Sequence, residues 1–120
     1  MYIRKLGDCT TITAGDNTIL KEILHPDRAA ASIRYSLAHA IVPPNTASLK
    51  HRLATSEVYY ILAGEGLMHI DDEKAPVSRN DTVYIPPGSV QWIENTGTEP
   101  LIFLCIVDPA WKMEDEEVFE

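Results

Sequence analysis

Two stretches of this 120-residue chain carry side chains that could do chemistry together. The first, NTASLKHRLATSEVYYILAGEG, places His51 six residues before Glu57, and the second, NDTVYIPPGSVQWIEN, carries Gln91. Their imidazole, carboxylate and amide groups are donors that can hold a divalent ion. The same groups could instead hydrogen-bond to one another in a polar pocket. Because side chains alternate along a strand, Glu57 and Tyr59 share one face, and Gln91 could meet them across a barrel.

The composition bounds the class of protein. Hydrophobic residues make up 45% of the chain and charged residues 23%, which is typical of a globular domain. Ten basic and eighteen acidic residues give a formal net charge of −8, which argues against nucleic acid and anionic membrane as partners. The start of the chain, MYIRKLGDCTT, lacks the apolar run of a signal peptide, and two cysteines do not make a disulfide framework. A cytoplasmic location is therefore expected.

The elements that must position these side chains are mostly strands. Residues 18–24, TILKEIL, form the one helical pattern, with Thr18 as its N-cap and Pro26 ending it. Strands are predicted over residues 33–42, 57–62, 66–71, 82–85, 90–94 and 101–107. Turn residues rich in Pro, Gly, Asn and Asp separate these short strands, and no helix lies between them. This pattern predicts an antiparallel sandwich or barrel.

The two stretches resemble the paired motifs of the cupin family. The first motif is a glycine, five residues, His-x-His, three or four residues, a glutamate, six residues and a glycine. Its positions hold Asn45, His51, Leu53, Glu57 and Gly64. The second is a glycine, five residues, Pro-x-Gly, two residues, a histidine, three residues and an asparagine, and its positions hold Asn80, Pro86, Gly88, Gln91 and Asn95. Asparagine tolerates positive φ, so Asn45 and Asn80 can make the turns of the missing glycines.

This resemblance implies an all-β fold, an antiparallel jelly-roll β-barrel with one short helix near the N-terminus. Family members with metal hold it through three histidines and one glutamate. Here His51, Glu57 and Gln91 would remain as ligands of iron, manganese, nickel or zinc, whereas Leu53 offers no donor. If no metal binds, His51 and Gln91 would hydrogen-bond to Glu57. No organic cofactor is expected.

Two classes of function stay open. One is a metal-dependent enzyme acting on a small molecule, as a dioxygenase, decarboxylase or isomerase. The other is a non-catalytic barrel that binds or senses a small ligand with a degenerate metal site. Catalytic residues cannot be assigned from the sequence. The ligand pocket is expected around Tyr59, Leu53, Ala38 and Ala40, because the small alanines would leave room beside the site.

The remaining expectations concern domains and assembly. Residues 1–120 should form one domain, with an N-terminal segment over 1–29, a barrel over 30–107 and an acidic tail over 108–120. The tail is expected to be solvated, unless Trp111 and Phe119 pin it to the barrel or to a second subunit. The outward face of residues 35–41 is too apolar for open water, so another subunit or the N-terminal segment is expected to cover it. The family resemblance also implies a homodimer, which is the assembly expected here.

Overall fold

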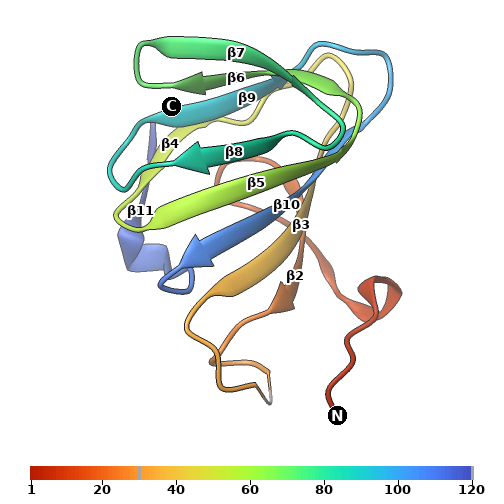
Figure 1. Ribbon diagram of the computed structural model, residues 1–120, viewed down its shortest axis with the longest axis vertical. Helices are drawn as coiled ribbons and strands as arrows, with labels where there is room; N and C mark the ends of the chain where they lie inside the picture. The colour runs from red at the N-terminus through yellow and green to blue at the C-terminus, as the bar shows by residue number, and fades with distance from the viewer. Residues whose placement is uncertain (30, 120) are drawn as a thin grey trace.

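In a computed structural model that describes residues 1–29 and 31–119, the chain forms two antiparallel β-sheets that face each other (Figure 1). The six-stranded sheet runs in the order β1 (Thr11–Thr13), β2 (Ile19–Leu24), β3 (Ser36–Val42), β10 (Leu101–Asp108), β5 (Ser56–Ala63) and β8 (Thr82–Ile85). The five-stranded sheet runs in the order β11 (Glu116–Phe119), β4 (Lys50–Leu53), β9 (Gln91–Asn95), β6 (Glu65–Ile70) and β7 (Glu73–Ser78). The all-β, antiparallel prediction is confirmed.

The predicted helix over residues 18–24 is wrong, because this segment is strand β2. It pairs with β1 on one side and with β3 on the other, where Lys21 lies opposite His39. A short apolar run fits either a helix or a strand, and here the open edge of β3 decides between them. Thr18 caps no helix, since its hydroxyl donates to Asp16 Oδ1 at 2.7 Å. The six-stranded sheet therefore begins at residue 11.

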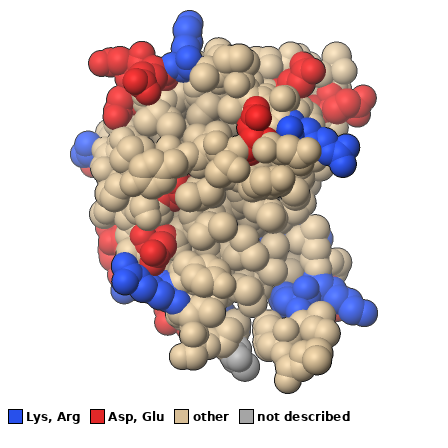
Figure 2. All heavy atoms as spheres, in the orientation of Figure 1, with Lys and Arg blue, Asp and Glu red and all other residues tan. Residues whose placement is uncertain are grey.

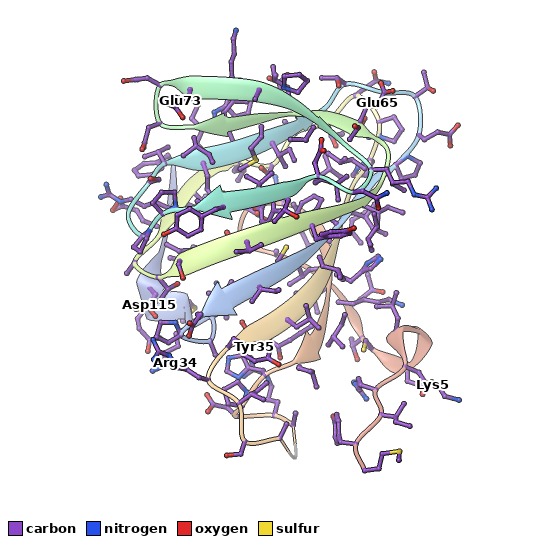
Figure 3. All side chains as sticks on the ribbon, in the orientation of Figure 1. Lys5, Arg34, Tyr35, Glu65, Glu73 and Asp115 are labelled. Carbon is purple, nitrogen blue, oxygen red and sulfur yellow. The ribbon has the colours of Figure 1, made fainter. Side chains whose placement is uncertain are left out.

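Helical structure within the described residues is limited to two short 3-10 turns, η1 (Leu6–Asp8) and η2 (Met113–Asp115). Figure 3 labels Asp115 in η2, just before the chain enters β11. None of the helices within residues 1–29 and 31–119 has the length and apolarity needed to cross a bilayer.

The acidic C-terminal segment is ordered against the barrel. Strand β11 pairs with β4, so that Phe119 lies opposite Lys50. Arg52 holds this pairing twice, through an ion pair with Glu117 at 2.6 Å and by lying over the ring of Phe119. The expectation of a solvated tail is wrong for residues 116–119, and pinning by Phe119 is the alternative that the structure supports.

The hydrophobic core fills the space between the two sheets. The turns of the two motifs set the order of the strands around this core. Its fully buried side chains come from both sheets: Phe103, Ile61, Ile85, Ile93, Leu101 and Val42. Asn45 and Asn80 have φ of 62° and 73°, so both asparagines adopt the left-handed backbone expected at these turns. Gly64, at φ 87°, has no room for a Cβ, which would lie 2.6 Å from the carbonyl oxygen of Pro100.

Candidate functional site

A cavity of about 220 Å³ opens between the sheets where β1, β2, β3, β4, β5, β10 and β11 meet. Most of its wall is apolar or aromatic, with Leu20, Phe103, Cys105 and Val107 from the six-stranded sheet and Trp111 from the segment before β11. The polar wall consists of carboxylates, a histidine and hydroxyl groups: Asp16, Glu22, Glu57, Glu116, His51, Thr13, Thr18, Ser36 and Tyr59. The exposed lining residues Ile12 and Gly15 connect the cavity with solvent.

His51 is buried in β4 with one ring nitrogen committed and the other directed at a carboxylate. Its Nδ1 lies 2.8 Å from the carbonyl oxygen of Leu49, and because that oxygen can only accept, Nδ1 donates. Its Nε2 lies 3.5 Å from Asp16 Oδ2. The backbone reinforces this pairing, since the Leu49 amide donates to the Asp16 carbonyl oxygen at 2.8 Å. His51 and Asp16 therefore form one polar corner of the cavity.

Glu57 and Tyr59 line the cavity and are joined by hydrogen bonds through the buried Gln91. The Gln91 amide nitrogen donates to Glu57 Oε1 at 2.8 Å, and the Tyr59 hydroxyl donates to the Gln91 oxygen at 3.0 Å. Gln91 is 0% exposed and pairs with His51 across β4 and β9. Both ends of its amide are thus used within the protein, which leaves its oxygen engaged with Tyr59.

The carboxyl of Glu57 favours its neutral form. Burial raises its pKa to about 8, and the hydrogen bond from Gln91 opposes this shift. The negative charges of Asp16 and Glu116 add to the rise. The pKa of Glu116 is also raised, first by burial, while His51 lowers it. These carboxylates therefore share one electrostatic environment, in which each added negative charge is costly.

The expected pocket residues line the same cavity. Ala38 and Ala40 on β3, Tyr59 on β5 and Leu53 on β4 all contribute to its wall, whereas His39 faces the other way. Leu53 is buried and shares the inward face of β4 with His51. Burial raises the pKa of the Tyr59 hydroxyl well above its ordinary value, so it stays a neutral donor.

Asp16, Trp111 and Glu116 are among the cavity residues that the sequence pattern does not assign to the site. Asp16 sits in the loop between β1 and β2, where Thr18 donates to Asp16 Oδ1 through both its amide and its hydroxyl. Glu116 opens β11 opposite Leu53. A Cβ on Gly15 would lie 2.7 Å from Glu116 Oε1, so this glycine makes room for the carboxylate. The sequence pattern does not assign these cavity residues to the site, because it predicts a helix over residues 18–24 and a solvated tail over residues 108–120.

The donors present do not fit the metal of the resembled family. Of its four ligand positions, one holds Leu53, which has no donor atom, and one holds Gln91, whose oxygen accepts from Tyr59. No group of three His, Cys, Asp or Glu side chains suited to hold an ion occurs within residues 1–29 and 31–119. The other histidines serve elsewhere: His25 donates to the Trp111 carbonyl oxygen, and His69 stacks on Trp92.

Comparison with known proteins places this geometry in a family. A family model for a cupin domain matches residues 38–107. An uncharacterized protein of Methanocaldococcus jannaschii is 46% identical over 106 residues, covering 88% of this chain and 84% of that protein. The oxalate-binding protein of Thermotoga maritima is 32% identical over 87 residues, covering 72% of this chain and 68% of that protein.

Solved structures agree in fold. The crystal structure of a predicted oxalate decarboxylase from Thermotoga maritima matches with a TM-score of 0.79, over 90% of this chain and 99% of that chain, at 23% identity. At this identity the match speaks for the fold alone. Asp16, Trp111 and Glu116 lie outside the matched residues 38–107, so the terminal segments supply these parts of the cavity wall.

Proposed function

The chain belongs to the cupin family, and we propose that it binds a small organic molecule in the cavity without the divalent metal of metal-holding cupins. The single observation that carries this proposal is the state of Gln91. A glutamine in place of a ligating histidine could still offer its oxygen, but here that oxygen accepts from Tyr59 while the amide donates to Glu57. Under this proposal, hydrogen bonds among Tyr59, Gln91 and Glu57 form the polar part of the pocket in place of a metal site.

The cavity supports small-molecule binding on its own terms. Its volume of about 220 Å³ lies below the range of about 300–1,000 Å³ common for drug-sized ligands, so the ligand is a small metabolite. The apolar wall supplies the binding free energy through burial, and the few polar groups fix the orientation. A non-catalytic binding or sensing role needs nothing more than these parts.

The competing hypothesis is a metal-dependent enzyme with His51, Glu57 and Gln91 as ligands of iron, manganese, nickel or zinc. In that arrangement the Gln91 oxygen, which already accepts from Tyr59, would ligate the ion through its second lone pair, and the Leu53 position would contribute nothing. Metal analysis of untagged protein decides between the two. We expect less than about a tenth of an equivalent of metal, with no gain after incubation with these four ions. Stoichiometric metal that is lost in Glu57→Gln would establish the enzyme-like site instead.

We further propose that two copies pack through the outer face of the six-stranded sheet. This face carries the apolar side chains Leu37, Ile41, Val58, Tyr60, Ile102, Leu104 and Ile106. Figure 2 shows that charged side chains gather mainly around the edges of the face turned to the viewer, and its middle is largely uncharged. Tyr35, labelled in Figure 3, extends the face at the start of β3. A second copy would remove this surface from water.

A further inference from the structure

We infer that the ligand of this cavity is a small organic cation, an ammonium group on an apolar or aromatic body. This inference rests on the proposed metal-free function and adds the chemical class of the ligand. The recognising groups are the carboxylates of Asp16, Glu57 and Glu116, and the aromatic side chains of Trp111 and Phe103 receive the body of the ligand.

The acidic side chains of the cavity wall favour a cationic ligand. Four carboxylates line the cavity, and among the residues that the structure describes no lysine or arginine does. Only Glu22 has an arginine partner, since Arg28 donates to both of its oxygens at 2.6 and 2.8 Å. Among the described lining residues His51 is the one basic group beside Asp16, Glu57 and Glu116, and Glu57 is neutral until the ligand binds. A cationic ligand would offset their mutual repulsion, whereas an anion would add to it.

A polar atom of Glu57 at the cavity, Oε2, also lacks a hydrogen-bond partner within the described part of the chain. Glu57 is 7% exposed, and its Oε1 accepts from Gln91, but Oε2 has no hydrogen bond with any described residue. Among the described residues, Thr55 Oγ1 is the one fully buried side-chain nitrogen or oxygen atom without a hydrogen bond. Glu57 Oε2 is therefore not fully buried, and because Glu57 lines the cavity, this oxygen opens on the cavity. In the free protein Glu57 is neutral at pH 7, and an ammonium N–H of the ligand at Oε2 would stabilise the ionised form, with release of the Glu57 proton to solvent.

The rest of the wall favours an organic cation over a bare ion. No trio of His, Cys, Asp or Glu within residues 1–29 and 31–119 is arranged to hold a metal. The wall instead places Trp111, Phe103 and Tyr59 around the carboxylates, and Tyr59 and Phe103 contact each other with ring centroids 4.4 Å apart. Aromatic faces attract ammonium groups and bury the apolar carbon attached to them.

Two of the three carboxylates come from outside the residues that the cupin family model matches. Asp16 arrives in the β1–β2 loop and Glu116 on β11, and Gly15 leaves the space that Glu116 Oε1 occupies. The terminal segments thus add negative charge to a barrel whose relative in Thermotoga maritima is named for binding oxalate, a dianion. The ligand inferred for this chain is a cation, so its charge is opposite in sign to that of oxalate.

The test compares three probes of matched size and different charge by calorimetric titration: benzylamine, benzyl alcohol and benzoate. At neutral pH the amine is a cation, so we expect it to bind at least about tenfold more tightly than the alcohol, with no measurable binding of benzoate. Asp16→Asn and Glu116→Gln should each weaken benzylamine binding by about tenfold and leave benzyl alcohol unaffected. Glu117→Gln is the matched control, because this neighbouring carboxylate points to solvent and pairs with Arg52.

Equal affinity for the three probes, a preference for benzoate, or an equal loss in Glu117→Gln would overturn the inference. Neutral or anionic probes that bind in the cavity would still leave a metal-free binding protein, so the proposed function would survive that result. Displacement of benzylamine by one equivalent of manganese chloride would instead identify a bare-ion site and overturn both proposals.

Discussion

At the residue scale, the account depends on the chain Tyr59–Gln91–Glu57, in which each donor meets one acceptor. Gln91 is the central member, and its two contacts keep it oriented along the cavity wall. In the proposed metal-free site these hydrogen bonds take the place of an ion, and they need well-placed partners to stabilise a buried amide.

Tyr59→Phe tests this chain at its far end. The variant keeps the ring but leaves the buried Gln91 oxygen without its donor, so the free energy of unfolding should fall by about 1–3 kcal/mol. Tyr60→Phe is the matched control, since Tyr60 points outward and bonds to Asn80 at an exposed site. Denaturant unfolding should detect less than about 0.5 kcal/mol of change for Tyr60→Phe. Equal losses for the two variants would contradict the account.

The raised pKa of Glu57 predicts a dependence of stability on pH. The folded chain keeps the Glu57 proton up to about pH 8, whereas the unfolded chain releases it near the ordinary value of 4.5. Between these values the folded state binds more protons, so the Glu57 contribution is greatest at low pH and declines as pH rises, by at most about 1.4 kcal/mol per pH unit. Urea unfolding at several pH values should show a shallower decline for Glu57→Gln than for the wild type. Parallel curves would rule out this role for Glu57.

At the element scale, β2 and β11 complete the cavity, and they are the strands that the local sequence pattern predicts least well. The motif spacing predicts the turns at Asn45 and Asn80 correctly, because their left-handed backbone is a local property. Ala38 and Ala40 are expected at the pocket, and both line the cavity from β3. The sequence pattern predicts a helix at β2 and a free tail at β11, because strand pairing decides both: β2 pairs with β1 and β3, and β11 pairs with the distant β4. Asp16 and Glu116 went unnoticed for the same reason.

Hydrogen exchange tests the strand β11 directly. The β11 amides pair with β4, so we expect a peptide covering residues 116–119 to exchange much more slowly than one covering the first residues of the chain. Arg52→Ala removes the ion pair with Glu117 and the contact with Phe119, and should speed exchange in β11. Exchange of β11 in the wild type at the rate of an unstructured peptide would support a solvated tail.

At the scale of the whole molecule, the chain divides its two faces between two tasks. The inner face of the six-stranded sheet lines the cavity through Ala38 and Ala40, and the outer face of the same strands carries the apolar surface proposed for dimer formation. Strand β10, paired with both β3 and β5, joins the two surfaces.

Ile106→Lys tests the proposed dimer. Ile106 lies on β10 between Leu37 and Val58 and is exposed, so a charge there should break a dimer without disturbing the core. Sedimentation should give a dimer for the wild type and a monomer for Ile106→Lys. Asp72→Asn makes the same change in net charge at the β6–β7 turn of the other sheet and should stay dimeric. A monomeric wild type would refute this interface.

Metal content shows directly whether hydrogen bonds stand in place of the metal in this cupin. Untagged wild type should be compared with Leu53→His/Gln91→His, which places histidines at the two altered motif positions. Leu53 lines the cavity with His51 and Glu57, and Gln91 pairs with His51 and bonds to Glu57. After incubation with iron, manganese, nickel or zinc, the account predicts less than about a tenth of an equivalent in the wild type and close to one in the double variant. One equivalent of metal in the wild type, lost on Glu57→Gln, would contradict it.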